Sequence, residues 1–251
     1  MRRFGPLILT IAAASCARYG FSEHEPTGEL GAVDVHLSDR GDPSAPLDTD
    51  GDKVPDALDP RPAVFDKVHY FGYPGARIGD FYAPGPGAWQ SSGDELCKYT
   101  DSDNESIAVL KPGLIPVTDY TVEATASVLG TGPVSGGDWP DVGLALRVTT
   151  TGTSTDGNLY QCLIDLKSRS LVVGGLYKGN WNEWDRTGNQ TVPAAGPYRI
   201  RATMKGSQLT CQLVPGPSIS HTDTKLTDGT CGYTTDYASV CFASLLVTDP
   251  I

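Results

Sequence analysis

The 251-residue sequence lacks the patterns of several large functional classes. Beyond its first fifteen residues no apolar run repeats at 3.6-residue spacing, which argues against a helical bundle. No Lys/Arg cluster offsets the formal net charge of −11, so phosphate backbones are repelled and nucleic acid is not expected as a partner. HExxH and GxSxG are both absent, and the four histidines are scattered. The sequence therefore does not support a zinc hydrolase or a serine hydrolase.

The sequence is instead rich in short segments that alternate apolar and polar residues. This period of two places one face of a strand in a core and leaves the other wet. Such segments occur at 120–128, 142–148, 160–166, 198–204 and 209–213. The turn at 205–207 joins the last two as a hairpin, and residues 240–247 are apolar in both phases, which is typical of a central or bulged strand. Together these segments predict an all-β, two-sheet antiparallel sandwich.

The N-terminus has the features of a signal peptide. An apolar stretch, 4–14, follows two arginines and is too short to span a bilayer. It ends in Ala-Ala-Ser-Cys at 13–16, which resembles the lipobox of bacterial lipoproteins, although leucine is usual at the first of these positions. The resemblance implies a signal peptide over 1–16, lipidation of Cys16, and an exported protein anchored to a membrane surface of the cell envelope. The alternative is an ordinary signal peptide cut after a small residue such as Ala14 or Ala17, which would release the protein.

Residues 17–64 are polar, acidic and punctuated by Gly and Pro, which predicts an extended acidic linker. Within it, residues 48–59 read DTDGDKVPDALD and have the spacing of a calcium loop. A Ca²⁺ ion needs six to eight hard oxygens at once, and alternate positions of one loop can supply them. The predicted ligands at positions 1, 3, 5, 7, 9 and 12 are Asp48, Asp50, Asp52, the Val54 carbonyl, Asp56 and Asp59.

The segment 48–59 also resembles thrombospondin type 3 repeats, which implies a structural Ca²⁺ in an extracellular linker. Lys53 stands where those repeats have glycine, and Asp59 is shorter than the bidentate glutamate of an EF-hand. A left-handed lysine costs about 1 kcal/mol, so we expect affinity in the extracellular, millimolar class. The alternative is a solvated acidic linker that holds no metal.

From residue 65 to the C-terminus the order of motifs resembles the concanavalin A-like lectin/glucanase superfamily, particularly its laminin G-like modules. The motifs are Trp89 with 93–96, then 119–124, 142–144, 197–201, 228–233 and 238–242. The resemblance implies one jelly-roll sandwich over 65–251. Glucanases of the superfamily carry paired acidic residues in an ExDxE-like strand, which is absent here, and the acidic run 101–105 is typical of a turn.

Five cysteines follow Cys16, and none has CxxC spacing, so zinc is not indicated. In an oxidising compartment we expect disulfides. Cys162 and Cys211 share the inward phase of their strands and form one candidate pair, the alternative being two buried thiols. The superfamily resemblance, in which the first and last strands lie close together, implies Cys97 with Cys241 as a second pair and leaves Cys231 over. The sequence leaves the connectivity open.

The most suggestive binding feature is the run Trp-Asn-Glu-Trp-Asp at 181–185. Aromatic faces stack on sugar rings, while Asn, Asp and Glu bind hydroxyls. The candidate ligand-binding residues are Trp139, Tyr177, Trp181, Asn182 and Trp184. Alternatively, Trp181 or Trp184 packs against the sheet. We interpret the chain as a non-catalytic module that binds carbohydrate or an extracellular protein. The alternatives are a glycan-cleaving enzyme of the same superfamily and a purely structural surface lipoprotein.

Overall fold

The computed structural model describes residues 47–59, 61–62, 67–83, 89–102, 106–115, 118–132, 139–149 and 157–250. The predicted signal peptide, the lipidation site at Cys16 and most of the predicted linker lie outside these residues. Residues 44–251 form one compact unit, so the calcium-type segment 48–59 and the strands belong to the same unit. Within the described part of the chain, no helix combines the length and apolarity that crossing a bilayer requires.

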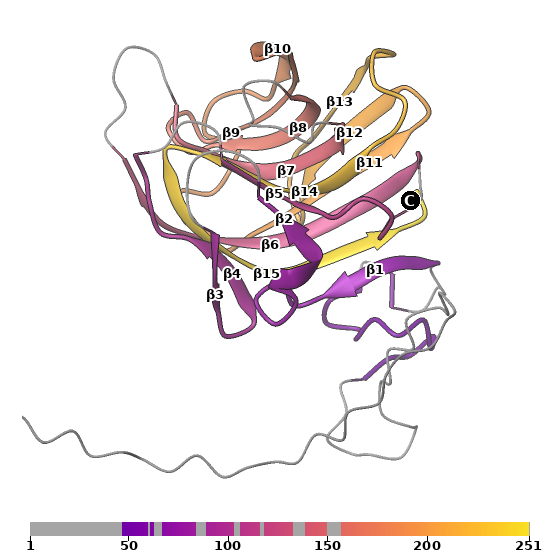
Figure 1. Ribbon diagram of the computed structural model, residues 1–251. Helices are drawn as coiled ribbons and strands as arrows, with labels where there is room; N and C mark the ends of the chain where they lie inside the picture. The colour runs from indigo at the N-terminus through magenta and orange to yellow at the C-terminus, as the bar shows by residue number, and fades with distance from the viewer. Residues whose placement is uncertain are drawn as a thin grey trace, which may run out of the picture. The chain divides into compact units, whose positions relative to one another are not determined.

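Two antiparallel sheets make up the fold, as the sequence predicts (Figure 1). The first sheet contains, in spatial order, β13 (Ser218–Thr222), β12 (Gln208–Leu213), β11 (Tyr198–Lys205), β6 (Tyr120–Thr131), β15 (Ala238–Thr248), β4 (Glu95–Lys98) and β3 (Trp89–Ser92), with β1 (Val68–Gly72) also paired to β15. The second contains β10 (Asn180–Arg186), β9 (Ser170–Tyr177), β8 (Asn158–Asp165), β7 (Asp141–Val148), β14 (Thr230–Asp236), β5 (Ser106–Leu110) and β2 (Phe81–Tyr82). One turn of 3₁₀ helix, Ile78–Asp80, precedes β2.

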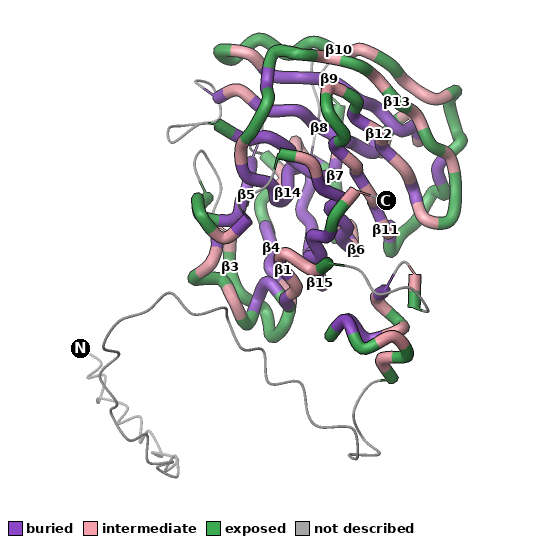
Figure 2. Tube along the Cα trace, turned by 90° about the vertical axis from the view of Figure 1, so that its right-hand side faces the viewer, coloured by how far each residue is buried: buried purple, intermediate pink, exposed green. Residues whose placement is uncertain are grey.

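The core lies between the two sheets and uses the alternating residues that the sequence indicates. In β11 and β12, the inward set is at most 4% exposed: Tyr198, Ile200, Ala202, Met204, Leu209, Cys211 and Leu213. Gly206 has a φ of 57° in the turn between these strands, the left-handed conformation that tight hairpins require. Figure 2 shows the inner strands β7 and β8 as buried and the edge strand β10 as mostly exposed.

The last strand, β15, is both central and bulged, which confirms the interpretation of its run of residues that are apolar in both phases. It pairs with β6 on one side and with β4 and β1 on the other, and its register shifts twice, at Ser239/Val240 and at Phe242/Ser244. A strand with neighbours on both sides buries residues of either phase wherever a bulge turns the chain.

The alternation in β6 predicts that the side chains pointing away from the core lie in water, and this prediction is partly wrong. Glu123 is only 4% exposed although its phase points away from the core. Its carboxylate binds the guanidinium groups of Arg199 and Arg201, which cover it. Paired and hydrogen-bonded in this way, a carboxylate can leave water without a large cost.

The prediction that the alternate apolar residues of β7 all face one core is wrong at the C-terminal end of the strand. Val142, Leu144 and Leu146 enter the main core, but Val148 joins a second apolar cluster on the opposite face of the second sheet. A bulge causes the change: Arg147 has a φ of 47°, and the register with β14 shifts at this point. As a result the Arg147 side chain, expected in water, is only 3% exposed.

Two disulfides join the candidate pairs. Cys162 of β8 is bonded to Cys211 of β12 and so connects the two sheets. Cys97 of β4 is bonded to Cys241 of β15, directly opposite it in the same sheet. Cys231 is a buried free thiol, and burial raises its pKa well above the ordinary thiol value.

Candidate functional sites

The alternate carboxylates of the segment 48–59 converge. One oxygen from each of Asp48, Asp50 and Asp52 lies within 4.8 Å of the others. The backbone N–H groups of Gly51 and Lys53 donate to the two oxygens of Asp48 at 2.8 and 3.2 Å. Oδ2 of Asp50 is buried and has no hydrogen-bond partner among the described residues. Clustered hard oxygens of this kind suit a Ca²⁺ ion, which would also relieve their mutual repulsion.

The other two predicted carboxylate ligands, Asp56 and Asp59, lie outside the three-carboxylate group. Asp56 accepts hydrogen bonds from the backbone N–H and the hydroxyl of Thr49 at 2.7 and 2.6 Å, and so closes the loop. Oδ1 of Asp59 accepts from the Arg61 N–H at 2.6 Å. Val54 is buried. Lys53 has a φ of 76°, the left-handed conformation for which glycine is favoured.

The candidate sugar-binding residues of β10 point to its two sides. Trp184 faces the inside of the sandwich, where its ring lies 5.2 Å from that of Tyr160 and stacks on His221 of β13 at 4.6 Å. A Cβ on Gly175 would come within 2.6 Å of the Trp184 ring, so glycine makes room for it. Trp184 thus packs at the rim where β10 lies beside β13. Asn182 is exposed on the strand.

Tyr177 belongs to the same rim and is held by a single carboxylate. The hydroxyls of Tyr177 and Tyr160 donate to Oδ1 of Asp223 at 2.9 and 2.7 Å. Burial alone would raise the pKa of Asp223, but hydrogen bonds from the Lys225 backbone N–H and the two tyrosines hold it below its ordinary value. Burial and the bond to Asp223 raise the pKa of Tyr177 far above its usual range. This network fixes the rim of the sandwich.

Trp181 lies on the other side of β10, which we call the outer side because it faces away from the first sheet. A Cβ on Gly174 would come within 2.3 Å of its ring, so the indole lies directly on the backbone of β9. Trp181 is nevertheless 41% exposed. The structure therefore separates Trp181 from Trp184, which are three residues apart in sequence.

Arg186, the last residue of β10, binds two carboxylates on the outer side. Its Nη1 donates to Asp165 at 2.6 Å and its Nη2 to Glu183 at 2.8 Å. The guanidinium lies 5.5 Å from the ring centroid of Trp139, which is also 41% exposed and has the Lys167 ammonium 4.5 Å from its ring. Two exposed indoles and one bidentate arginine thus share this side of the sheet.

The suggestive run 181–185 included Glu183, but neither Glu183 nor Arg186 was among the candidate ligand-binding residues. In a regular strand, residues three apart point to opposite faces. A register shift between Glu183 and Asp185 inserts an extra residue, which turns both side chains to the outer side. The only sequence signal for pairing Arg186 with Glu183 was their opposite charge, which is too common on surfaces to indicate a site.

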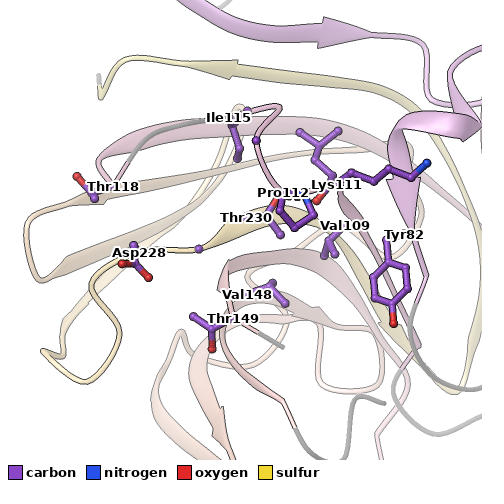
Figure 3. Close-up of a pocket in the computed structure, with 13 residues that line it drawn as sticks. Tyr82, Val109, Lys111, Pro112, Ile115, Thr118, Val148, Thr149, Asp228 and Thr230 are labelled. Atoms are coloured by element: carbon purple, nitrogen blue, oxygen red, sulfur yellow. Dashed lines mark hydrogen bonds between the residues drawn. The ribbon is translucent and has the colours of Figure 1, made fainter. Parts of the chain in front are cut away.

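A pocket lies at the opposite edge of the second sheet from β10 (Figure 3). Its volume is about 750 Å³, within the range of small-molecule sites. Apolar side chains dominate the lining, among them Val109, Ile115 and Val148, and Tyr82 forms one wall. Asp228 is the one carboxylate among the described lining residues. No residue of this pocket was a candidate site residue from the sequence, because its walls come from segments far apart in the chain.

The fold resembles solved β-sandwich modules. The carbohydrate-binding module CBM66 from Bacillus subtilis has a TM-score of 0.55 at 15% identity, over 68% of this chain and 96% of that chain. A Bacillus subtilis protein of unknown function with a galectin-like fold gives 0.53 at 12%, over 74% and 97%. The metal-free carbohydrate recognition domain of Emp46p gives 0.51 at 14%, over 71% and 92%. No protein-family model and no curated protein matches the chain. The likeness shows that the chain has a galectin-like β-sandwich fold.

Proposed function

We propose that this chain is a non-catalytic carbohydrate-binding module whose glycan lies along the outer side of β10. The supporting observation is that Trp181 and Trp139, each 41% exposed, lie on the same side of the sheet as the Arg186 guanidinium. Indole faces stack on the apolar faces of sugar rings. Trp181 pairs with Leu176 and Arg186 with Val172, a separation of four residues on β9, or about 13 Å. That span suits several linked sugar rings rather than one.

Polar groups between the two indoles provide partners for hydroxyls. The side chain of Glu183 is 39% exposed, and its carboxylate keeps acceptor capacity beyond its bonds to Arg186. The hydrogen bonds that the Arg186 guanidinium donates to Glu183 raise the pKa of Arg186, so its charge is permanent. Because Arg186 is also bonded to Asp165, Ser168 and Ser170, its position is set before a ligand arrives.

The carboxylate arrangement supports binding over cleavage. Glycoside hydrolysis needs two carboxyl groups about 5 to 10 Å apart on either side of the scissile bond. On the outer side, Glu183 and Asp165 are both bound to one guanidinium, and the pocket beside Tyr82 offers Asp228 alone among its described residues. Two similar structures, a carbohydrate-binding module and a carbohydrate recognition domain, support this proposal.

A glycan array tests the proposal directly. We expect the full chain to retain a subset of oligosaccharides, and Trp181→Ala and Trp139→Ala each to weaken retention about tenfold, which corresponds to about 1.4 kcal/mol per stacking contact. Tyr99→Ala is the matched control, because Tyr99 is a 50% exposed aromatic residue beyond the end of β4 in the other sheet. Retention of no glycan, or wild-type retention by both tryptophan variants, would contradict the proposal.

We further propose that Asp48, Asp50 and Asp52 bind a structural Ca²⁺, with Val54, Asp56 and Asp59 completing the loop. The convergence of three carboxylates within 4.8 Å supports this assignment. We expect Ca²⁺ to slow proteolysis between Asp48 and Asp59, and Asp50→Ala to abolish that protection. Equal cleavage with and without Ca²⁺ in the wild type would remove the metal assignment.

Export and lipid anchoring through Cys16 complete the proposed function, and the basis for both is the lipobox-like N-terminus. Expression in a bacterial host with an alkyne-labelled fatty acid tests the anchor. We expect label on the wild type and none on Cys16→Ser. Label that persists in Cys16→Ser would contradict lipidation at this residue.

A further inference from the structure

The pocket beside Tyr82 is separate from the proposed glycan strip. It opens at the β2 and β5 edge of the second sheet, whereas Trp181 lies on β10 at the other edge. Figure 3 shows Val109, Val148 and Pro112 around the middle of the pocket, with Asp228 towards one end and Tyr82 and Lys111 towards the other. An apolar interior with a few polar groups at its ends is typical of sites for small molecules.

A buried arginine holds the walls of this pocket in place. Arg147 donates to the carbonyl oxygens of Thr118 at 2.9 Å, Gly206 at 2.6 Å and Leu226 at 2.6 Å. Thr118 lines the pocket, and Leu226 belongs to the segment that leads to Asp228. Because the Arg147 side chain is only 3% exposed, these bonds replace the lost hydration of its guanidinium and tie three loops to one point.

Glycine completes the wall next to Asp228. Gly229 has a φ of 133°, and a Cβ there would lie 2.5 Å from the carbonyl carbon of Arg147. The segment 228–230 therefore lies directly against the bulge of β7, and the pocket is formed without a ligand. A pre-formed site avoids the cost of ordering its loops on binding.

We infer that this pocket binds a small molecule with an apolar, ring-containing body and a cationic head group. The apolar lining and the Tyr82 ring fit the body. Asp228 fits the head, because its carboxylate forms no ion pair with another described residue and it is the one acid in the described lining. Lys111 extends past Tyr82, at the end of the pocket away from Asp228 (Figure 3). The formal net charge of −11 also favours cations at this surface.

Three probes of one size separate the contributions of body and head. We expect calorimetric titration of the full chain to show saturable binding of 1-naphthylmethylamine, and about fivefold weaker binding of neutral 1-naphthalenemethanol, the most that an exposed ion pair contributes. Anionic 1-naphthoate should bind more weakly still. Asp228→Asn should bring the amine and the alcohol to equal affinity, and Tyr82→Ala should weaken all three probes.

Both substituted side chains are exposed, so the fold should be retained. Tyr99→Ala and Trp181→Ala serve as controls that leave probe binding unchanged. Absence of saturable binding of every probe would overturn the site, and equal affinity for the amine and the carboxylate would overturn the head-group assignment. Loss of glycan retention in Trp181→Ala with intact probe binding separates this inference from the proposed carbohydrate function.

Discussion

The hydroxyl of Tyr120 accepts a hydrogen bond from the backbone N–H of Arg147 at 2.9 Å. Tyr120 belongs to β6 and Arg147 to β7, so this bond crosses the core from one sheet to the other. Both residues are at most 2% exposed. The bond satisfies the N–H of a bulged residue that has no place in the regular ladder.

We predict that Tyr120→Phe lowers the free energy of unfolding by about 1 to 3 kcal/mol, because the Arg147 N–H is then buried without a partner. Guanidinium denaturation followed by tryptophan fluorescence measures the change. Tyr73→Phe is the control, because Tyr73 is 41% exposed and should leave the midpoint unchanged. Equal midpoints for Tyr120→Phe and the wild type would contradict the role of this bond.

Because the two tryptophans of β10 lie on opposite sides of the strand, we predict that replacing them lowers the unfolding free energy by different amounts. Trp184→Ala should lower the unfolding free energy by about 2 to 3 kcal/mol, because its ring packs on Tyr160 and the core. Trp181→Ala should cost less than about 1 kcal/mol, because the residue is 41% exposed. Thermal denaturation measures the loss of stability in each variant. A larger loss in Trp181→Ala than in Trp184→Ala would show that the two sides of the strand are wrongly assigned.

In the calcium-type loop, Lys53→Gly should raise the affinity for Ca²⁺ by about tenfold. The substitution removes the strain of a lysine at a φ of 76°, about 1 kcal/mol, and an ammonium that repels the cation. Calorimetric titration with Ca²⁺ measures the affinity. Arg61→Gly controls for the loss of a positive charge nearby, and equal gains in both variants would show that charge, not backbone conformation, limits binding.

Binding of Ca²⁺ to this loop should also affect the stability of the sandwich. The carbonyl oxygen of Leu58 accepts a hydrogen bond from Nη2 of Arg199 at 2.9 Å, and Arg199 also binds Glu123. The loop therefore contacts the first sheet through a fixed guanidinium. Through this contact, Ca²⁺ bound in the loop would affect the stability of the sheet.

The rim carboxylate Asp223 predicts a pH dependence. Its pKa is lower in the folded than in the unfolded protein, so its stabilising effect is complete above the ordinary aspartate value and is lost as the pH falls through the folded pKa. Asp223→Asn should reduce stability at pH 7 and flatten its decline between about pH 5 and pH 2. Tyr177→Phe, which removes one donor, should give an intermediate slope. Urea denaturation across this range measures both, and an unchanged slope in Asp223→Asn would contradict the assignment.

Local pattern was enough to predict the sandwich and part of its covalent framework. The alternation in 198–213 places each apolar residue inside, because a strand turns successive side chains to opposite faces whatever its neighbours are. The inward phase of Cys162 and Cys211 likewise made them a candidate pair, and the structure bonds them between the two sheets. The spacing of Asp48, Asp50 and Asp52 indicated their convergence, because a tight loop brings alternate residues together.

Tertiary structure decided the features that interrupt this regular alternation. A bulge in β10 brings Glu183 and Arg186 to one side, and another in β7 buries Arg147 and turns Val148 outward. No local pattern specifies where such a bulge falls, since it depends on how the partner strand is paired. The pocket beside Tyr82 required β2, β5, β7 and the approach to β14 to meet. Residues so distant in the chain become one surface only when the two sheets have closed on their core.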